Sequence, residues 1–236
     1  MLSYNILAQK NLTGHQNLYR GKPQYLLDWE YRWTGIQREV KTYNPDIVTF
    51  QEVQFSDPDH FSQQIQPWFA KEGFETVSQR RTGDKHDGCA IFFRSDKFSL
   101  VSSRGVLYRH ADVPVLDKDN VGIVCCLRGS NGSRLAVATT HLLFNPKRHE
   151  IRLAQTALLL AELDRVAWDH PSQGYIPVIL TGDLNLQPFS DTYNLLTKGR
   201  CGHSRALRNT IYLYRSIYRA SPYYIYISWE NILYRS

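Results

Sequence analysis

Apolar residues in the first 199 positions recur at two spacings, one typical of helices and the other of strands. The clearest helical spacing, with intervals of four and three, is formed by Trp29, Trp33, Ile36, Val40 and Tyr43. This face predicts a helix that ends before Pro45, because the residue before a proline avoids helical backbone. A second helix is predicted at about 58–71, where Pro67 kinks or ends it, and a long third helix at about 149–168.

Short runs rich in β-branched and aromatic residues predict strands. They occupy residues 2–7, 46–50, 74–79, 88–94, 98–108, 121–128, 134–141 and 177–181. The pair Asn131-Gly132 lies between two of these runs and favours a hairpin. Hairpins pair strands antiparallel, whereas strand–helix–strand units pair them in parallel. We therefore expect one α/β domain with mixed sheets over residues 1–199.

Composition changes this picture mainly through the location of the charge. The chain has 236 residues, 42% of them hydrophobic, which excludes intrinsic disorder and a disulfide-stapled miniprotein. Residues 1–199 contain 22 Lys+Arg and 21 Asp+Glu, a net charge of +1. Residues 200–236 contain six Arg and one acid, a net charge of +5, so the overall pI of about 9.1 gives only weak support for nucleic-acid binding.

The basic segment 200–236 also holds seven of the 15 tyrosines and contains no Lys or Asp. It has neither a clear helical period nor the composition of a linker, so we interpret it as an aberrant tail outside the fold, such as a frameshifted or alternatively spliced end. The four cysteines form no metal-ligand spacing, and no signal peptide or membrane-length apolar run is visible. We expect an intracellular protein, cytoplasmic or nuclear, with no membrane insertion and no predictable protein partner.

Polar side chains occur at four places within or directly after the predicted strands. They are Asn5, Glu52, His141 and the pair Asp183 and Asn185. Each alone has an ordinary structural explanation: a satisfied buried amide, a helix cap, a structural histidine and a polar turn. Strand ends in α/β folds are where side chains converge on ligands. Together the residues predict a site for metal-assisted hydrolysis of a phosphoester.

In this interpretation Glu52 holds Mg²⁺, which takes oxygen ligands and needs few of them from protein. Asp183 activates a water, while His141 and Asn185 stabilise the charge of the phosphorane. Asp183 and Asn185 are expected to face the same way if the backbone between them is extended. Nucleophilic catalysis and the common nucleotide-binding folds are disfavoured, because the sequence lacks GxSxG, GxxxxGK[ST] and GxGxxG motifs.

Six motifs in this order resemble the endonuclease/exonuclease/phosphatase superfamily, and within it the branch of nocturnin and the yeast-type deadenylases. The motifs are SYNILAQ at 3–9, PDIVTFQEVQ at 45–54, DGCAIF at 87–92, DNVG at 119–122, THLLFNP at 140–146 and GDLN at 182–185. Two longer stretches look most like the protein angel homologues, namely RTGDKHDGC at 81–89 and HLLFNPKR at 141–148. The resemblance covers residues 1–199.

The resemblance implies a four-layer α-β-β-α sandwich of two mixed sheets, with a Mg²⁺-dependent site between the sheet edges. The residues that match the family's site are Glu52 and Asn5 for the metal, His141, Asp183 and Asn185 for catalysis, and Asn120, Asn145 and Pro146 for substrate binding. The implied activity is a metal-dependent phosphodiesterase acting on RNA 3′ ends. The substrate is then either poly(A) or a 2′,3′-cyclic phosphate.

The resemblance stops near residue 199, which leaves the sandwich incomplete at its C-terminus. The family continues with further strands and a Ser-Asp-His motif whose His completes the phosphate site. The tail contains one His, His203, without the preceding Asp. We therefore expect a truncated form with impaired activity. Two alternatives stay open: a non-catalytic fragment that binds RNA or a protein, and a phosphatase or phospholipase of the same superfamily.

Overall fold

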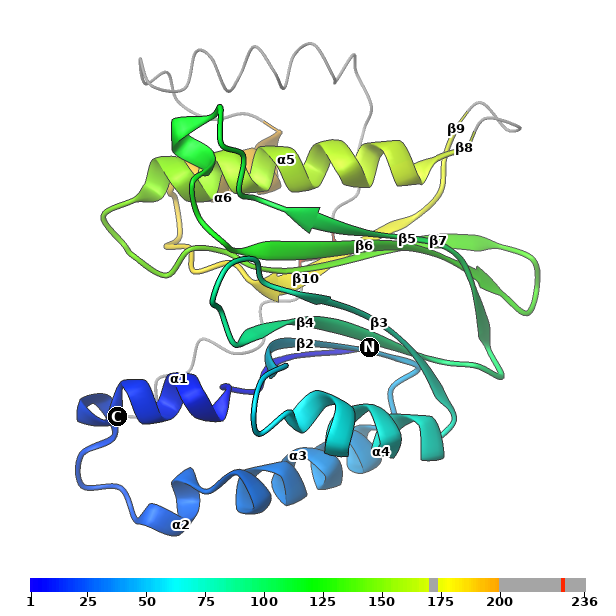
Figure 1. The fold of residues 1–236 in the computed structure, drawn as a ribbon. Helices are drawn as coiled ribbons and strands as arrows, with labels where there is room; N and C mark the ends of the chain where they lie inside the picture. The colour runs from blue at the N-terminus through cyan, green and yellow to red at the C-terminus, as the bar shows by residue number, and fades with distance from the viewer. Residues whose placement is uncertain (170–173, 200–225, 228–236) are drawn as a thin grey trace.

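The computed structural model describes residues 1–169, 174–199 and 226–227. Two sheets lie face to face, and helices cover the outer face of each (Figure 1). The first sheet has the strand order β1-β2-β4-β3 and the second the order β11-β10-β7-β6-β5. Each sheet contains both parallel and antiparallel pairs. The predicted α-β-β-α sandwich with two mixed sheets is confirmed.

The element bounds are as follows. The first sheet consists of β1 (Leu2–Asn5), β2 (Ile47–Gln54), β3 (Phe74–Arg80) and β4 (Asp87–Arg94). The second consists of β5 (Phe98–Leu107), β6 (Val121–Gly129), β7 (Arg134–His141), β10 (Val178–Asp183) and β11 (Tyr226–Ile227), and a separate ribbon pairs β8 (Trp168–Asp169) with β9 (Gly174–Tyr175). The helices are α1 (Gln9–Gly14), α2 (Gln24–Leu27), α3 (Trp29–Tyr43), α4 (Gln66–Lys71), α5 (His149–Ala167) and α6 (Asp191–Lys198), with short turns η1 (Gln16–Tyr19), η2 (Phe61–Ile65) and η3 (Pro114–Leu116).

Apolar side chains are divided among three cores. In β4, Ala90 and Phe92 face the helices that cover the first sheet, whereas Ile91 and Phe93 face the second sheet. The third core lies between the second sheet and helices α5 and α6. Because such strands are buried on both faces, they appear in the sequence as continuous apolar runs rather than as alternating ones.

Helix α3 begins and ends where the pattern predicts. The Asp28 carboxylate caps the helix by accepting hydrogen bonds from the main-chain N–H groups of Glu30 and Tyr31. The helix ends at Asn44, whose φ of 42° is left-handed, directly before Pro45. The predicted helix at 58–71 is present over 61–71, as a π-helical segment at 61–65 that continues directly into α4, and Pro67 lies in the first turn of α4 without ending it. Proline is favoured in the first turn of an α-helix, where its fixed φ matches the helical value.

The C-terminal bounds of two strands that carry predicted site residues differ from the prediction. Strand β1 ends at Asn5, two residues before the predicted end, and β2 continues to Gln54, four residues beyond it. Glu52 therefore lies inside a strand and not after one. The predicted hairpin is confirmed, since β6 and β7 pair antiparallel across the turn that contains Asn131-Gly132.

Most of the segment 200–236 lies outside the described residues, so the interpretation of this segment as a tail beyond the fold stays a prediction. Its residues 226–227 form β11, which pairs in parallel with Ile179 and Leu180 of β10. Among the helices of the described residues, none has the length and apolar composition that a bilayer crossing requires.

Three cysteines, Cys89, Cys125 and Cys126, are buried free thiols. Burial raises the pKa of Cys125 to about 12 and raises that of Cys89 as well, so both thiols stay protonated at about pH 8. Alkylation requires the thiolate, so neither thiol is reactive at this pH. We expect iodoacetamide to leave Cys89 and Cys125 unmodified in the folded chain and to modify both in urea, as read by peptide mass spectrometry. Rapid alkylation of Cys125 in the folded chain would contradict its burial between the sheets.

Candidate active site

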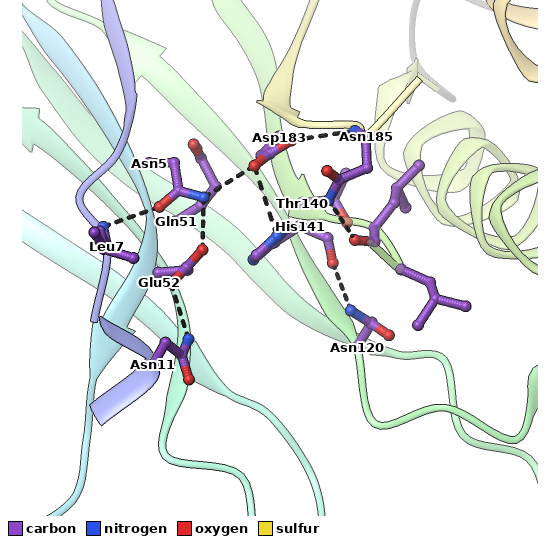
Figure 2. Close-up of polar contacts among 12 residues, drawn as sticks. Asn5, Leu7, Asn11, Gln51, Glu52, Asn120, Thr140, His141, Asp183 and Asn185 are labelled. Carbon is purple, nitrogen blue, oxygen red and sulfur yellow. Dashed lines mark hydrogen bonds and ion pairs between the residues drawn. The ribbon is translucent and has the colours of Figure 1, made fainter. Parts of the chain in front are cut away.

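Polar side chains from four strands meet where the two sheets face each other (Figure 2). Asn5 ends β1 and Glu52 lies in β2, both in the first sheet. His141 ends β7 and Asp183 ends β10, both in the second sheet. In each sheet the two strands are parallel neighbours, so their C-terminal ends lie at the same edge. The structure thus brings together four of the residues that the sequence singles out.

The Asn5 side chain joins the two sheets. Its Nδ2 donates to Glu52 Oε1 at 2.8 Å and to Asp183 Oδ2 at 2.9 Å. Its Oδ1 accepts a hydrogen bond from the main-chain N–H of Leu7 at 2.9 Å. Because the Leu7 N–H can only donate, this bond fixes which end of the Asn5 amide faces the carboxylates. One amide nitrogen therefore holds two acidic side chains from opposite sheets.

Glu52 lies at a β-bulge. The register between β2 and β4 shifts between Gln51 and Val53, and Glu52 has a φ of 55°. A bulge re-aims a side chain and interrupts the strand alternation. The second oxygen of Glu52, Oε2, accepts a hydrogen bond from Asn11 Nδ2 of α1 at 2.8 Å. Asn11 is a site residue that sequence reasoning missed, and an Asn in a short amphipathic turn gives no distinguishing signal.

His141 and Asp183 face each other across the β7–β10 pair. His141 Nε2 lies 3.6 Å from Asp183 Oδ2, and Asp183 Oδ1 accepts the main-chain N–H of Asn185 at 3.1 Å. The His141 Nδ1 atom is buried without a hydrogen-bond partner among the described residues. The Asp183 side chain is 31% exposed, so water reaches the carboxylate.

The backbone between Asp183 and Asn185 is not extended, so the condition for the expectation that the two side chains face the same way is not met. The φ of Asn185 is 49°, so the chain turns after β10, and the Asp183 carboxylate closes that turn. The Asn185 Nδ2 donates to the main-chain oxygen of Leu142 at 3.0 Å. The second N–H of this amide has no partner among the described residues, so it is available to a ligand.

Asn120 lies behind His141 and is 3% exposed. Its Nδ2 donates to the main-chain oxygen of His141 at 3.1 Å, and its Oδ1 accepts from Gln155 Nε2 at 3.3 Å. Asn120 thus supports the backbone of His141 instead of facing solvent. Asn145 and Pro146 lie in the loop after β7, where the Asn145 Oδ1 accepts the N–H of Lys147. The structure places these two residues beside the cluster and not in its hydrogen-bond network.

Gly182 lets β10 approach β7 closely just before Asp183. Its φ is 133°, and a Cβ at this position would lie 2.2 Å from the main-chain oxygen of Thr140. The pairing that results sets Gly182 opposite Thr140 and Asp183 opposite His141. The Gly of the GDLN motif is therefore required for the register that brings the acid to the histidine.

The acidic pair fits a divalent cation. Glu52 and Asp183 contact the same amide nitrogen, and neither pairs with a Lys or Arg in the part of the chain that the structure describes. Mg²⁺ is commonly held by one or two carboxylates together with water and substrate phosphate. No three His, Cys, Asp or Glu side chains gather as ligands within residues 1–169 and 174–199, and Mg²⁺ does not need such a group.

The sequence and the fold match one protein family. The chain belongs to the Endonuclease/Exonuclease/phosphatase family, whose model matches residues 2–230. Within it, the chain is 43% identical over 204 residues to protein angel homolog 2 of Danio rerio, covering 85% of this chain and 35% of that protein. It is 39% identical over 208 residues to protein angel homolog 1 of Homo sapiens, covering 84% of this chain and 30% of that one. The chain thus spans about a third of the length of these relatives.

Two solved structures share the architecture. The crystal structure of ANGEL2, a 2′,3′-cyclic phosphatase, in complex with adenosine-2′,3′-vanadate matches with a TM-score of 0.80 and 39% identity, over 84% of this chain and 57% of that one. The human nocturnin catalytic domain with bound sulfate matches with a TM-score of 0.67 and 28% identity, over 82% of this chain and 66% of that one.

Proposed function

We propose that this chain is a Mg²⁺-dependent phosphodiesterase of RNA 3′ ends, with 2′,3′-cyclic phosphate ends as its first substrate class. The observation that carries the proposal is that Glu52 and Asp183, from two sheets, meet on the Asn5 amide, with His141 beside Asp183 (Figure 2). The choice of substrate is supported by the higher identity to the cyclic phosphatase ANGEL2, 39%, than to nocturnin, 28%.

Each residue has a role that follows from its contacts. Glu52 is the metal ligand, and Asn5 and Asn11 hold its two oxygens in place. When bound, Mg²⁺ would neutralise charge on the phosphoryl oxygens. Asp183 is close enough to solvent to take a proton from a water, which then attacks phosphorus while one ester P–O bond of the ring breaks. The released ribose oxygen takes up a proton from solvent and becomes a hydroxyl, and the phosphate stays attached through the other ester bond.

Charge that develops on the phosphoryl oxygens requires nearby donors. His141 supplies a ring N–H on the side that faces Asp183. Asn185 supplies the second N–H of its side-chain amide, the one that does not donate to the Leu142 main-chain oxygen. The buried amides of Asn120 and Gln155 keep the His141 backbone in place for this contact. The residues that sequence analysis assigns to catalysis therefore have compatible positions in the proposed reaction.

The substrate proposal is tested with two RNA oligonucleotides of one sequence, one ending in a 2′,3′-cyclic phosphate and the other in adenosines with a free 3′-OH. With Mg²⁺ we expect loss of the cyclic phosphate, and none after EDTA. Stepwise shortening of the second RNA with no change in the first would favour the poly(A) exonuclease instead. If neither RNA is changed, the chain is the non-catalytic fragment and the proposal is wrong.

Glu52→Gln tests the metal assignment. The substitution keeps the volume and one acceptor oxygen but removes the negative charge. We therefore expect the rate at a fixed Mg²⁺ concentration to fall by at least the roughly 10- to 100-fold that loss of an outer-shell partner of a metal ligand costs. The measurement is the initial rate against Mg²⁺ concentration. Glu75→Gln, at an exposed position of β3, is the matched control and should leave the curve unchanged. An unaltered curve for Glu52→Gln would overturn the assignment.

A further inference from the structure

Two arginines outside the proposed catalytic set lie on the outer helices, Arg32 on α3 and Arg152 on α5. Arg152 is 6% exposed, and Arg32 is partly buried. Burial lowers the pKa of both guanidinium groups, although each stays charged at neutral pH. Buried charges are usually paired with an opposite charge. Within the described residues, however, both side chains donate mainly to main-chain oxygens and neither contacts a carboxylate.

Arg32 holds the turn that follows β1. Its Nη1 donates to the main-chain oxygens of Ile6 at 2.8 Å and Leu7 at 2.9 Å, and its Nη2 donates to Gln9 Oε1 at 2.6 Å. Leu7 has a φ of 53°, a conformation that few bulky residues adopt unaided. The N–H of this residue is the group that orients the Asn5 amide. Arg32 thereby fixes the turn on which the position of Asn5 depends.

Arg152 holds the loop that follows β7 in the same way. Its Nη1 donates to the oxygens of Leu143 at 3.2 Å and Asn145 at 2.5 Å, and its Nη2 to that of Pro146 at 3.2 Å. Gln155, almost one turn further along α5, accepts the Leu143 N–H at 3.1 Å. The chain directly after His141 is thus bonded to α5 through both its N–H and its C=O groups.

We propose that Arg32 and Arg152 are paired positioning residues. Each outer helix uses one guanidinium to fix the segment directly after a strand that carries a site residue, Asn5 in the first sheet and His141 in the second. Arginine suits this task because its planar fork reaches two or three carbonyl oxygens at once, whereas a lysine ammonium is a compact point charge. The consequence for turnover rests on the proposed function, whereas the fixing of the two segments does not.

The kinetic test uses Arg32→Lys and Arg152→Lys, with the exposed Arg38→Lys on α3 and Arg165→Lys on α5 as matched controls. Misplacement of a reacting group by a fraction of an ångström to 1 Å lowers the chemical step, so we expect kcat to fall by about 10- to 100-fold in the first two variants, with KM little changed. The controls should keep full kcat. Leu163→Ala, in the buried face of α5, should lower Tm and leave the kcat of the folded protein unchanged.

A readout that needs no turnover separates this inference from the proposed function. In NMR spectra we expect Arg32→Lys to shift the Asn5 side-chain amide signals and Arg152→Lys to shift the His141 ring signals, whereas Arg38→Lys and Arg165→Lys shift neither. If the wild-type chain shows no turnover, the proposed function fails, and the NMR signals alone then test whether Arg32 and Arg152 position the two segments. Unshifted signals in both variants, or a kcat loss that Leu163→Ala reproduces, would overturn the positioning role.

Discussion

Asp183→Asn is expected to lower turnover of the RNA substrate by about 100- to 10,000-fold, the range typical of a lost general base. The carboxylate has a second role that an amide cannot fill. Its Oδ1 accepts the Asn185 N–H and its Oδ2 accepts Asn5 Nδ2. An Asn at position 183 would offer one oxygen and would turn its NH₂ group toward one of these two donors, so the variant loses both the base and one contact between the sheets.

The measurement is kcat and KM at saturating Mg²⁺, with Tm recorded for the same samples. Asp96→Asn, in the exposed turn between β4 and β5, is the control for a lost surface charge and should behave as wild type. We expect the loss for Asp183→Asn to appear in kcat, because the carboxylate acts on the attacking water and not on the bound RNA. Full activity in this variant would show that another group takes the proton.

Phe92→Ala should be the most damaging change to stability, with the free energy of unfolding lowered by about 3–5 kcal/mol, as is usual for removing a buried phenylalanine. Phe92 is 0% exposed in β4. Its ring stacks on that of Phe69 with centroids 3.8 Å apart and contacts the edge of Phe50 at 5.5 Å. Alanine would leave a cavity between the first sheet and its covering helices.

Urea unfolding followed by far-ultraviolet circular dichroism measures this loss. Phe144→Ala is the matched control, because the Phe144 side chain is 71% exposed in the loop after β7. Its effect on the free energy of unfolding should stay within about 0.5 kcal/mol. A loss at position 144 equal to that at position 92 would mean that the core between the first sheet and its helices is not the main source of stability.

The longer helices α3 and α5 and most strands could be predicted because local spacing determines them, whereas the short helices α1, α2 and α6 were not predicted. Helix α3 shows this well, since its apolar spacing, the capping Asp28 and the following Pro45 all indicate the same bounds. The conformations of Glu52 and Asn185 could not be predicted. Both have positive φ values, which are uncommon outside glycine; asparagine adopts them more often than most residues, but its type alone does not indicate them. For Glu52 the cause is a register shift against β4, a strand about 40 residues further along the chain.

The site was predictable in its residue types but not in its connections. Asn5 and Asp183 are 178 positions apart, and only the pairing of the two sheets brings them within 2.9 Å. Asn120 illustrates the limit, because its motif is visible in the sequence while its burial behind His141 is not. Asn11 and Arg32 carried no signal at all, since their partners are a carboxylate and main-chain oxygens contributed by distant or irregular segments.

The bulge at Glu52 places the carboxylate at the proposed site at a cost to the stability of the strand. On either side of the bulge, Phe50 and Val53 both pack into the core between the first sheet and its helices, although they are three positions apart. In a regular strand, Val53 would lie on the opposite face, and residue 52 would share the face of Phe50 and place its carboxylate among aromatic rings. A regular ladder would regain the backbone energy lost at the bulge, about 1–3 kcal/mol, but it would forfeit the proposed metal ligand. Under the proposed function, the strained conformation of Glu52 lowers the stability of the fold in order to keep a carboxylate at the site.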